Sequence, residues 1–197
     1  MKRTATMERK TTETAITVSL GLDGTGTYDV STGVPFLDHM LELFAKHGLF
    51  DLAIRASGDT HVDDHHTVED VGLCLGDALA RALGDKKGIA RYGFFLLPMD
   101  EALAEVALDL SGRPFLVFDA AFEQEKIKEF DVTLIEEFWR AFCTRAQATL
   151  HIRARHGKDA HHVSEAIFKG VARALCAAVQ RDPRRPDVPS TKGSLTA

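Results

Sequence analysis

An internal repeat constrains this chain most, because it fixes how many similar modules the 197 residues must build. In the first half, the alternating segment LFDLAIRA precedes DDHHTVEDVGLCLGDALARAL, and in the second half ATLHIRAR precedes DAHHVSEAIFKGVARALCAAV. Each copy therefore has a strand-like alternation, an HHxxE motif and a helical stretch rich in Ala and Leu. The repeat predicts two modules packed about a pseudo-two-fold axis.

Hydrophobic periodicity predicts the same order of elements in both halves. The first half is expected to contain a hairpin of 14–20 and 27–31 around a turn at 23–26, a helix at 35–48, a strand at 49–57 and a helix at 63–83. The second half is expected to contain a hairpin of 101–110 and 114–122, a helix at 132–147, a strand at 148–155 and a helix at 159–181. This predicts an α+β fold: a duplicated β-β-α-β-α module with two sheets and packed helices.

No stretch rich in Gly, Ser or Pro separates the halves, so we expect one compact unit. Its parts are a first module at 1–88, a second module at 89–181 and a basic C-terminal arm at 182–197. Together with Arg181, which precedes it, the arm has the sequence RDPRRPDVPSTKGSLTA. This stretch has two interpretations. Its composition favours a frayed tail, and its basic and hydroxyl residues are also compatible with an arm that folds over an anionic ligand.

Charge and hydropathy exclude several classes of partner. A net charge of -5 gives no broad electrostatic support for binding nucleic acid. No apolar run is long enough for a membrane span, and the N-terminus lacks the apolar core of a signal peptide, so a cytoplasmic protein is expected. The three cysteines lie far apart in apolar helical patterns, which favours reduced core thiols over a disulfide or a zinc site.

The duplicated HHxxE motif indicates metal binding. On a helix, residues four apart share a face, so the first histidine and the glutamate of each motif can hold one ion. The second histidine is turned by about 100° and serves another ion more easily, which suggests two metals with each helix contributing to both. Imidazole and carboxylate without thiolate suit Mn(II), and Fe or Zn are alternatives. The predicted ligands on the two helices are His65, His66, Glu69, His161, His162 and Glu165.

The repeat also nominates one ligand on each preceding helix. His39 lies 26 residues before His65, and Glu137 lies 24 residues before His161, at the corresponding place of the second half. The alternatives are a buried, hydrogen-bonded histidine for His39 and a solvated helix face for Glu137. Four further histidines have weaker claims as ligands: His47, His61, His151 and His156.

The stretches VPFLDHM, GDTHVDDHHTVEDVG, PMDEALAEVALDLSGRP, TLHIRARHGKDAHHVSEAIFKGVARAL and PSTKG resemble the imidazoleglycerol-phosphate dehydratase family over nearly the whole chain. The resemblance implies the monofunctional enzyme of histidine biosynthesis, with two Mn(2+) per active site. It also implies a homo-oligomer of 24 subunits, with metal sites between neighbouring subunits. Many family members have a histidine, in a pattern like EHFF, where this chain has Glu137.

The resemblance also assigns roles to residues outside the motifs. It implies that Glu13 is the catalytic acid–base and contacts the substrate, with Asp100 as a second acid and Asp38 as a residue that orients ligands. The phosphate of the substrate is expected to contact cations and a hydroxyl. These phosphate-binding positions are Arg91, Arg113, Lys169, Ser190 and Lys192.

The reaction that the resemblance implies is dehydration of D-erythro-imidazoleglycerol phosphate to imidazole-acetol phosphate. The proton that leaves is not adjacent to a carbonyl, so an enolate cannot form. Two metals on the imidazole nitrogens would stabilise an imidazolate, which expels hydroxide through a diazafulvene-like intermediate. Two other functions stay open at this point: a dimetal hydrolase, and a helical metal-storage protein, which the strand-like segments disfavour.

Overall fold

The computed structural model describes residues 3–195, which form two four-stranded sheets, one two-stranded sheet and four helices. Residues 1–2 of the expected first module and 196–197 of the expected arm lie outside this range. The first half contains β1 (Thr4–Lys10), β2 (Thr14–Gly21), β3 (Tyr28–Ser31), α1 (Pro35–Gly48), β4 (Asp51–Gly58) and α2 (His65–Leu83). The second half contains β5 (Tyr92–Met99), β6 (Ala102–Asp109), β7 (Phe115–Asp119), β8 (Lys126–Ile127), β9 (Phe130–Asp131), α3 (Leu134–Ala146), β10 (Thr149–His156) and α4 (Ala160–Val179).

The two large sheets share one topology, which confirms the α+β class and the duplication. Their strand orders are β1-β2-β4-β3 and β5-β6-β10-β7, and in both the last strand pairs in parallel with its neighbour. The first module has one strand more than expected, β1, and the second has three more, β5, β8 and β9. β1 and β5 were missed because edge strands carry the charges, Thr, Gly and Pro that weaken a strand signal.

Both expected hairpins are wrong. β3 pairs in parallel with β4 instead of returning along β2, and β7 pairs in parallel with β10 instead of β6. In the first module, the carboxylate of Asp51 accepts hydrogen bonds from the backbone N–H groups of Thr25 and Thr27, at 2.9 and 3.2 Å. These contacts carry the chain after the turn to the start of β4, which overrides the local hairpin signal.

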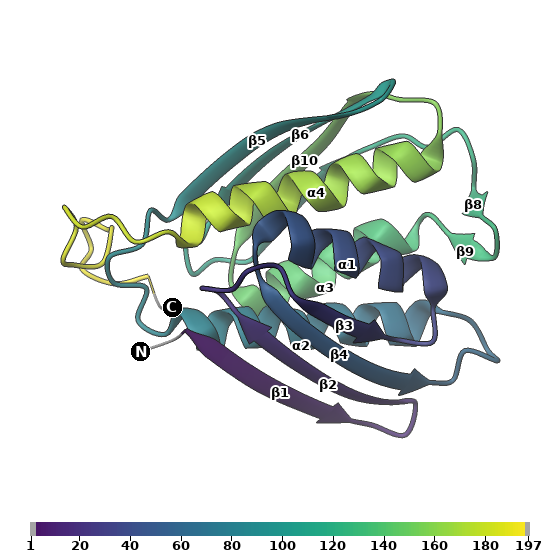
Figure 1. Ribbon diagram of the computed structural model, residues 1–197, viewed down its shortest axis with the longest axis horizontal. Coiled ribbons are helices and arrows are strands. Elements are labelled where there is room, and N and C mark those ends of the chain that lie inside the picture. The colour runs from purple at the N-terminus through teal and green to yellow at the C-terminus, as the bar shows by residue number, and fades with distance from the viewer. Residues whose placement is uncertain (1–2, 196–197) are drawn as a thin grey trace.

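The four helices lie between the two sheets (Figure 1). α2 packs on the first sheet and α4 on the second, while α1 packs against α4 and α3 against α2. Each module thus lays its shorter helix on the other module's long helix, a reciprocal arrangement that a pseudo-two-fold relation predicts. Aromatic side chains fill the junction: the ring centroid of Trp139 lies 4.8 Å from that of Phe168 and 6.2 Å from that of Phe44. None of the described helices combines the length and apolar character needed to cross a membrane.

Candidate functional site

Both HHxxE motifs stand at the start of a long helix, α2 or α4, at the same end of the molecule (Figure 1). An aspartate two residues before the motif accepts a hydrogen bond from the first histidine's backbone N–H in each case. Asp63 accepts from His65 at 2.9 Å and Asp159 from His161 at 2.8 Å. These bonds satisfy N–H groups that a helix start leaves without an intrahelical partner, so the local sequence places both motifs alike.

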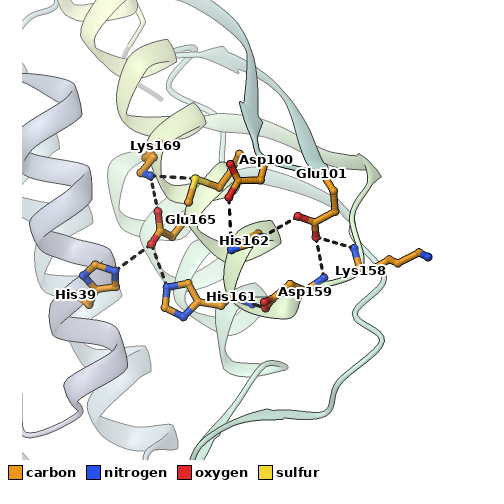
Figure 2. A network of polar contacts seen from close by, with 10 residues as sticks. His39, Asp100, Glu101, Lys158, Asp159, His161, His162, Glu165 and Lys169 are labelled. Carbon is orange, nitrogen blue, oxygen red and sulfur yellow. Dashed lines mark hydrogen bonds and ion pairs between the residues drawn. The ribbon is translucent and has the colours of Figure 1, made fainter.

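The second motif forms a three-residue cluster with α1. Figure 2 shows Glu165 between His39 and His161. Its Oε1 atom lies 3.1 Å from His39 Nε2 and 3.0 Å from His161 Nε2. The three ligating atoms lie within 4.8 Å of one another, and among residues 3–195 this is the group of three that could hold an ion. The packing of α1 against α4 therefore brings together three side chains that the sequence nominated as ligands.

Glu165 is buried, yet its carboxylate remains charged. Burial raises the pKa, but hydrogen bonds from Lys169, His39 and His161 outweigh it and hold the pKa of Glu165 at about 2. Lys169 contacts the other carboxylate oxygen from one helical turn further along α4. Two imidazole nitrogens and an ionised carboxylate are a donor set that suits a first-row divalent ion, so these residues fit a bound metal.

The first motif is more open. His65 Nε2 and Glu69 Oε2 lie 4.0 Å apart, and both side chains are more than a third exposed. Glu137, the expected third ligand, lies with its carboxylate 3.9 Å from the guanidinium of Arg140. It forms no ligand group with His65 and Glu69 among the described residues. The structure thus assembles the His39 side of the predicted pair and leaves the Glu137 side incomplete within one chain.

The second histidine of each motif has a carboxylate on its Nδ1 atom. His66 Nδ1 lies 3.0 Å from Asp59 Oδ2, and His162 Nδ1 lies 2.7 Å from Glu101 Oε2. These hydrogen bonds raise the pKa of both histidines. Sequence reasoning missed both carboxylates. Glu101 lies 61 residues from His162, and no periodic pattern joins these two residues or joins Asp59 to His66.

The other ring nitrogen of each of these histidines faces an acid from the first turn of its module. His66 Nε2 lies 3.9 Å from Glu13 Oε1, and His162 Nε2 lies 3.8 Å from Asp100 Oδ2. Both acids, nominated from the sequence, therefore stand beside the motifs. The Oδ1 atom of Asp38 accepts hydrogen bonds from the backbone N–H and the hydroxyl of Thr32, at 2.7 and 2.6 Å, and its role in orienting ligands stays a prediction.

Four of the five expected phosphate-binding residues line one cavity of about 680 Å³. The guanidinium of Arg91 is held by the Asp109 carboxylate at 2.7 and 3.0 Å and donates to the carbonyl of Pro189 at 2.8 Å. The hydrogen bonds that Arg91 donates to Asp109 raise the pKa of Arg91, so its charge is secure. Lys169 lies apart, beside Glu165. The four residues that line the cavity are Arg91, Arg113, Ser190 and Lys192.

Hydrogen bonds from Gly88 to the carbonyl of Asp187 and from Arg91 to that of Pro189, at 3.1 and 2.8 Å, hold the described part of the arm in place, which favours the folded arm over the frayed tail. The arm lies at the left of Figure 1, beyond the C-terminal end of α4, whereas the motifs lie at the right. The backbone N–H of Arg91 bonds the carbonyl of Ala178 near that C-terminal end. Glu165 and Ala178 are separated by about 20 Å along the helix axis, at 1.5 Å per residue. One chain therefore holds its ligand cluster and its basic cavity at opposite ends.

The comparisons with known proteins agree on one family. The sequence model of imidazoleglycerol-phosphate dehydratase matches residues 32–175. Similar proteins of that name occur in Methylorubrum extorquens and Hydrogenovibrio crunogenus. Each is 58% identical over 194 residues, which cover 98% of this chain and 100% of the relative.

Two solved structures are also similar. Imidazoleglycerol-phosphate dehydratase from Staphylococcus aureus is 41% identical with a TM-score of 0.83, and the match covers 91% of this chain and 99% of that one. IGPD from Pyrococcus furiosus, in complex with (S)-C348, is 36% identical with a TM-score of 0.84, and the match covers 96% of this chain and 100% of that one. The agreement therefore extends from sequence to fold.

Proposed function

The chain belongs to the imidazoleglycerol-phosphate dehydratase family, and from this premise we propose how its residues carry out the reaction. It is a hydro-lyase of histidine biosynthesis. In detail, we propose that it dehydrates D-erythro-imidazoleglycerol phosphate to imidazole-acetol phosphate, with two Mn(2+) per active site. We also propose that the protein is cytoplasmic. Its proposed parts are a first module at 1–88, a second module at 89–181 and the arm at 182–197.

The cluster of His39, His161 and Glu165 carries the metal part of this proposal. These residues would hold one ion, and His65 with Glu69 would contribute to the other. His66 and His162 would each serve the ion that the first histidine of its own motif does not hold. Glu137 remains a candidate ligand that nothing in the single chain brings to the first motif. When bound, the ions would supply Lewis acidity to the imidazole ring and favour its deprotonated form. The imidazolate and diazafulvene-like states stay part of the proposal.

Glu13 is proposed as the acid–base that moves the carbon-bound proton. Its side chain is exposed in the turn between β1 and β2, where a substrate can reach it, and it faces His66 across 3.9 Å. A carboxylate needs to come within hydrogen-bond reach of the proton that it removes, and an exposed turn satisfies that requirement. Asp100 occupies the equivalent turn of the second module and is a second candidate.

The basic cavity would bind the substrate phosphate. Arg91 is fixed by Asp109 and Pro189, so it adds a preorganised positive charge. The exposed side chains of Arg113 and Lys192 are free to turn toward an anion, and the hydroxyl of Ser190 adds a donor. Lys169, one turn from Glu165, would instead contact the substrate near the ligand cluster.

The distance between the cluster and the cavity supports an active site completed between subunits. A phosphorylated imidazole triol is far shorter than the roughly 20 Å that separates the two along α4. Exposed apolar side chains on the outer face of the second sheet are typical of a surface that is buried in an assembly. Tyr92, Phe94 and Leu96 lie along β5 at one edge of this sheet, and Phe115 lies on β7 at the opposite edge. We therefore propose self-association, with the 24-mer of the family as the expected assembly.

The experiment measures turnover of imidazoleglycerol phosphate before chelation, after it and after Mn(2+) is added back. We expect ketone formation without phosphate release, loss after chelation and recovery with Mn(2+). His65→Ala and His161→Ala should each lose most of the turnover. Full activity in either variant would contradict the proposal, and phosphate release would favour the dimetal hydrolase.

A further inference from the structure

Glu101 divides its two carboxylate oxygens between different tasks. Oε1 accepts hydrogen bonds from the backbone N–H groups of Lys158 and Asp159, at 3.1 and 2.9 Å, at the start of α4. Oε2 lies 2.7 Å from His162 Nδ1 (Figure 2). The two backbone bonds therefore fix which oxygen faces the imidazole ring.

This arrangement determines the tautomer of His162. An ionised carboxylate has no proton to donate, so Nδ1 must carry a hydrogen, and the lone pair of a neutral ring then lies on Nε2. A carboxylate on one ring nitrogen is the partner that typically orients a histidine for binding a metal through the other. His66 is held in the same way, since both carboxylate oxygens of Asp59 lie 3.0–3.2 Å from its Nδ1.

We propose that Glu101 and Asp59 are positioning residues that fix His162 and His66 with the Nε2 lone pair available to a divalent ion, on the side where Asp100 and Glu13 stand 3.8 and 3.9 Å away. The inference rests on the proposed function, because it presupposes that the second histidines are ligands. It assigns a role in metal affinity to two carboxylates that are not themselves placed among the ligands.

The two carboxylates differ in a way that makes the proposal testable. In Glu101→Gln, the amide oxygen is expected to keep the two backbone hydrogen bonds, so the amide NH₂ must face His162 Nδ1. That group donates, which draws the lone pair to Nδ1 and places the proton on Nε2. In Asp59→Asn, the amide can rotate and still accept from Nδ1, because within residues 3–195 the Asp59 carboxylate is hydrogen-bonded to His66 alone.

The test measures Mn(2+) affinity of the assembled protein by titration, following the paramagnetic resonance signal of free aqueous Mn(2+). We expect Glu101→Gln to weaken binding roughly 10- to 100-fold, the usual effect of losing such a partner. Asp59→Ala should weaken it by a similar factor, and Asp59→Asn by much less. Melting temperature and oligomeric size should stay at parental values, because the contacts that start α4 are retained.

The outcomes separate this inference from the proposed function. Parental affinity in both Glu101→Gln and Asp59→Ala would overturn the positioning role while leaving metal binding intact. A loss of affinity that follows a fall in melting temperature in Glu101→Gln would also overturn it, since Glu101 would then act through the helix start. A parental protein that turns over substrate without binding Mn(2+) would instead refute the proposed function.

Discussion

At the scale of single residues, the carboxylate of Glu165 organises the ligand cluster. Three side chains from two helices converge on its two oxygens: His39 from α1, and His161 and Lys169 from α4. Without a metal, these donors compensate the buried charge; with a metal, the same geometry brings both imidazoles toward one ion. The residue therefore couples the packing of α1 and α4 to metal affinity.

Glu165→Gln should lower Mn(2+) affinity at least about tenfold, because a neutral amide is a weaker ligand and the histidines lose their anionic partner. Turnover at limiting substrate should fall with it. Calorimetric titration with Mn(2+) measures the first effect. Glu105→Gln is a matched control. The carboxylate of Glu105, on β6, pairs with Arg155 on β10, so this substitution should leave the Mn(2+) affinity unchanged. Equal affinity in Glu165→Gln and the parent would contradict the role of the cluster.

The ion pair between Arg3 and Asp23 predicts a pH-dependent contribution to stability. The hydrogen bond from Arg3 lowers the pKa of Asp23 below its usual 3.8 in the folded state. Its contribution is therefore present above pH 3.8 and is lost as the pH falls through the lowered value. Because the Asp23 side chain is 45% exposed, Asp23→Asn should cost only about 0.5 kcal/mol at neutral pH.

Urea denaturation of the parent and Asp23→Asn measures this difference. The gap between their unfolding free energies should close in acid, below the lowered pKa. Asp29→Asn is a control, because the ion pair of Asp29 with Arg55 has both side chains well exposed and should contribute less. A gap that stays constant down to that pH would show that the charge of Asp23 does not stabilise the fold.

The residues that sequence could predict are those that the repeat duplicates. Both HHxxE motifs and His39 follow from matching positions in the two halves, and Glu165 and His39 do meet in space. Glu101 could not be predicted, because its contact with His162 depends on the turn between β5 and β6, a strand pair that the pattern missed. Glu137 forms no ligand group with the first motif among the described residues, so its role as a ligand stays a prediction.

At the scale of elements, the close contact of α2 with α3 depends on two glycines. A Cβ atom at Gly72 would lie 2.7 Å from the carbonyl oxygen of Phe138, and one at Gly76 would lie 2.5 Å from that of Phe142. Both clashes are with backbone, which cannot rotate away. The glycines thus let the long helix of one module lie directly on the shorter helix of the other.

Gly76→Ala should therefore destabilise the protein by about 1–3 kcal/mol, the usual cost of overpacking, although alanine is normally the better helix former. The unfolding free energy in urea measures the change. Gly170→Ala in α4 is the control: its Cβ would meet mainly a terminal methyl of Val106 at 3.0 Å, which has room to shift, so a smaller loss is expected. A more stable Gly76→Ala would contradict the close packing.

Sequence predicted all four helices of the described chain to within a few residues, because each has a long apolar periodicity and a clear start. Strand pairing was predicted less well. Periodicity assigns residues to a strand, but the partner strand depends on contacts such as that of Asp51 with Thr25 and Thr27, which no local pattern encodes. Parallel pairing across an intervening helix has the weakest local signal of all.

At the scale of the whole molecule, the ligand cluster and the basic cavity lie at opposite ends of α4, so one chain cannot bring both to a small substrate. If neighbouring subunits complete each site, two inactive variants should restore activity when they assemble together. His161→Ala damages the ligand cluster and leaves the cavity intact, whereas Arg113→Ala damages the cavity and leaves the cluster intact.

Dissociating and reassembling an equal mixture of these variants should recover up to roughly a quarter of the parental turnover, because a working site needs one intact contribution from each of two subunits. Each variant reassembled alone should stay near its own low activity. The control is the double variant with His161→Ala and Arg113→Ala in one chain. When it is reassembled alone, no subunit contributes an intact ligand cluster or an intact cavity, so no activity should return. If the mixture shows only the average of the two variants, each site lies within one chain and the assembly contributes no residue to it.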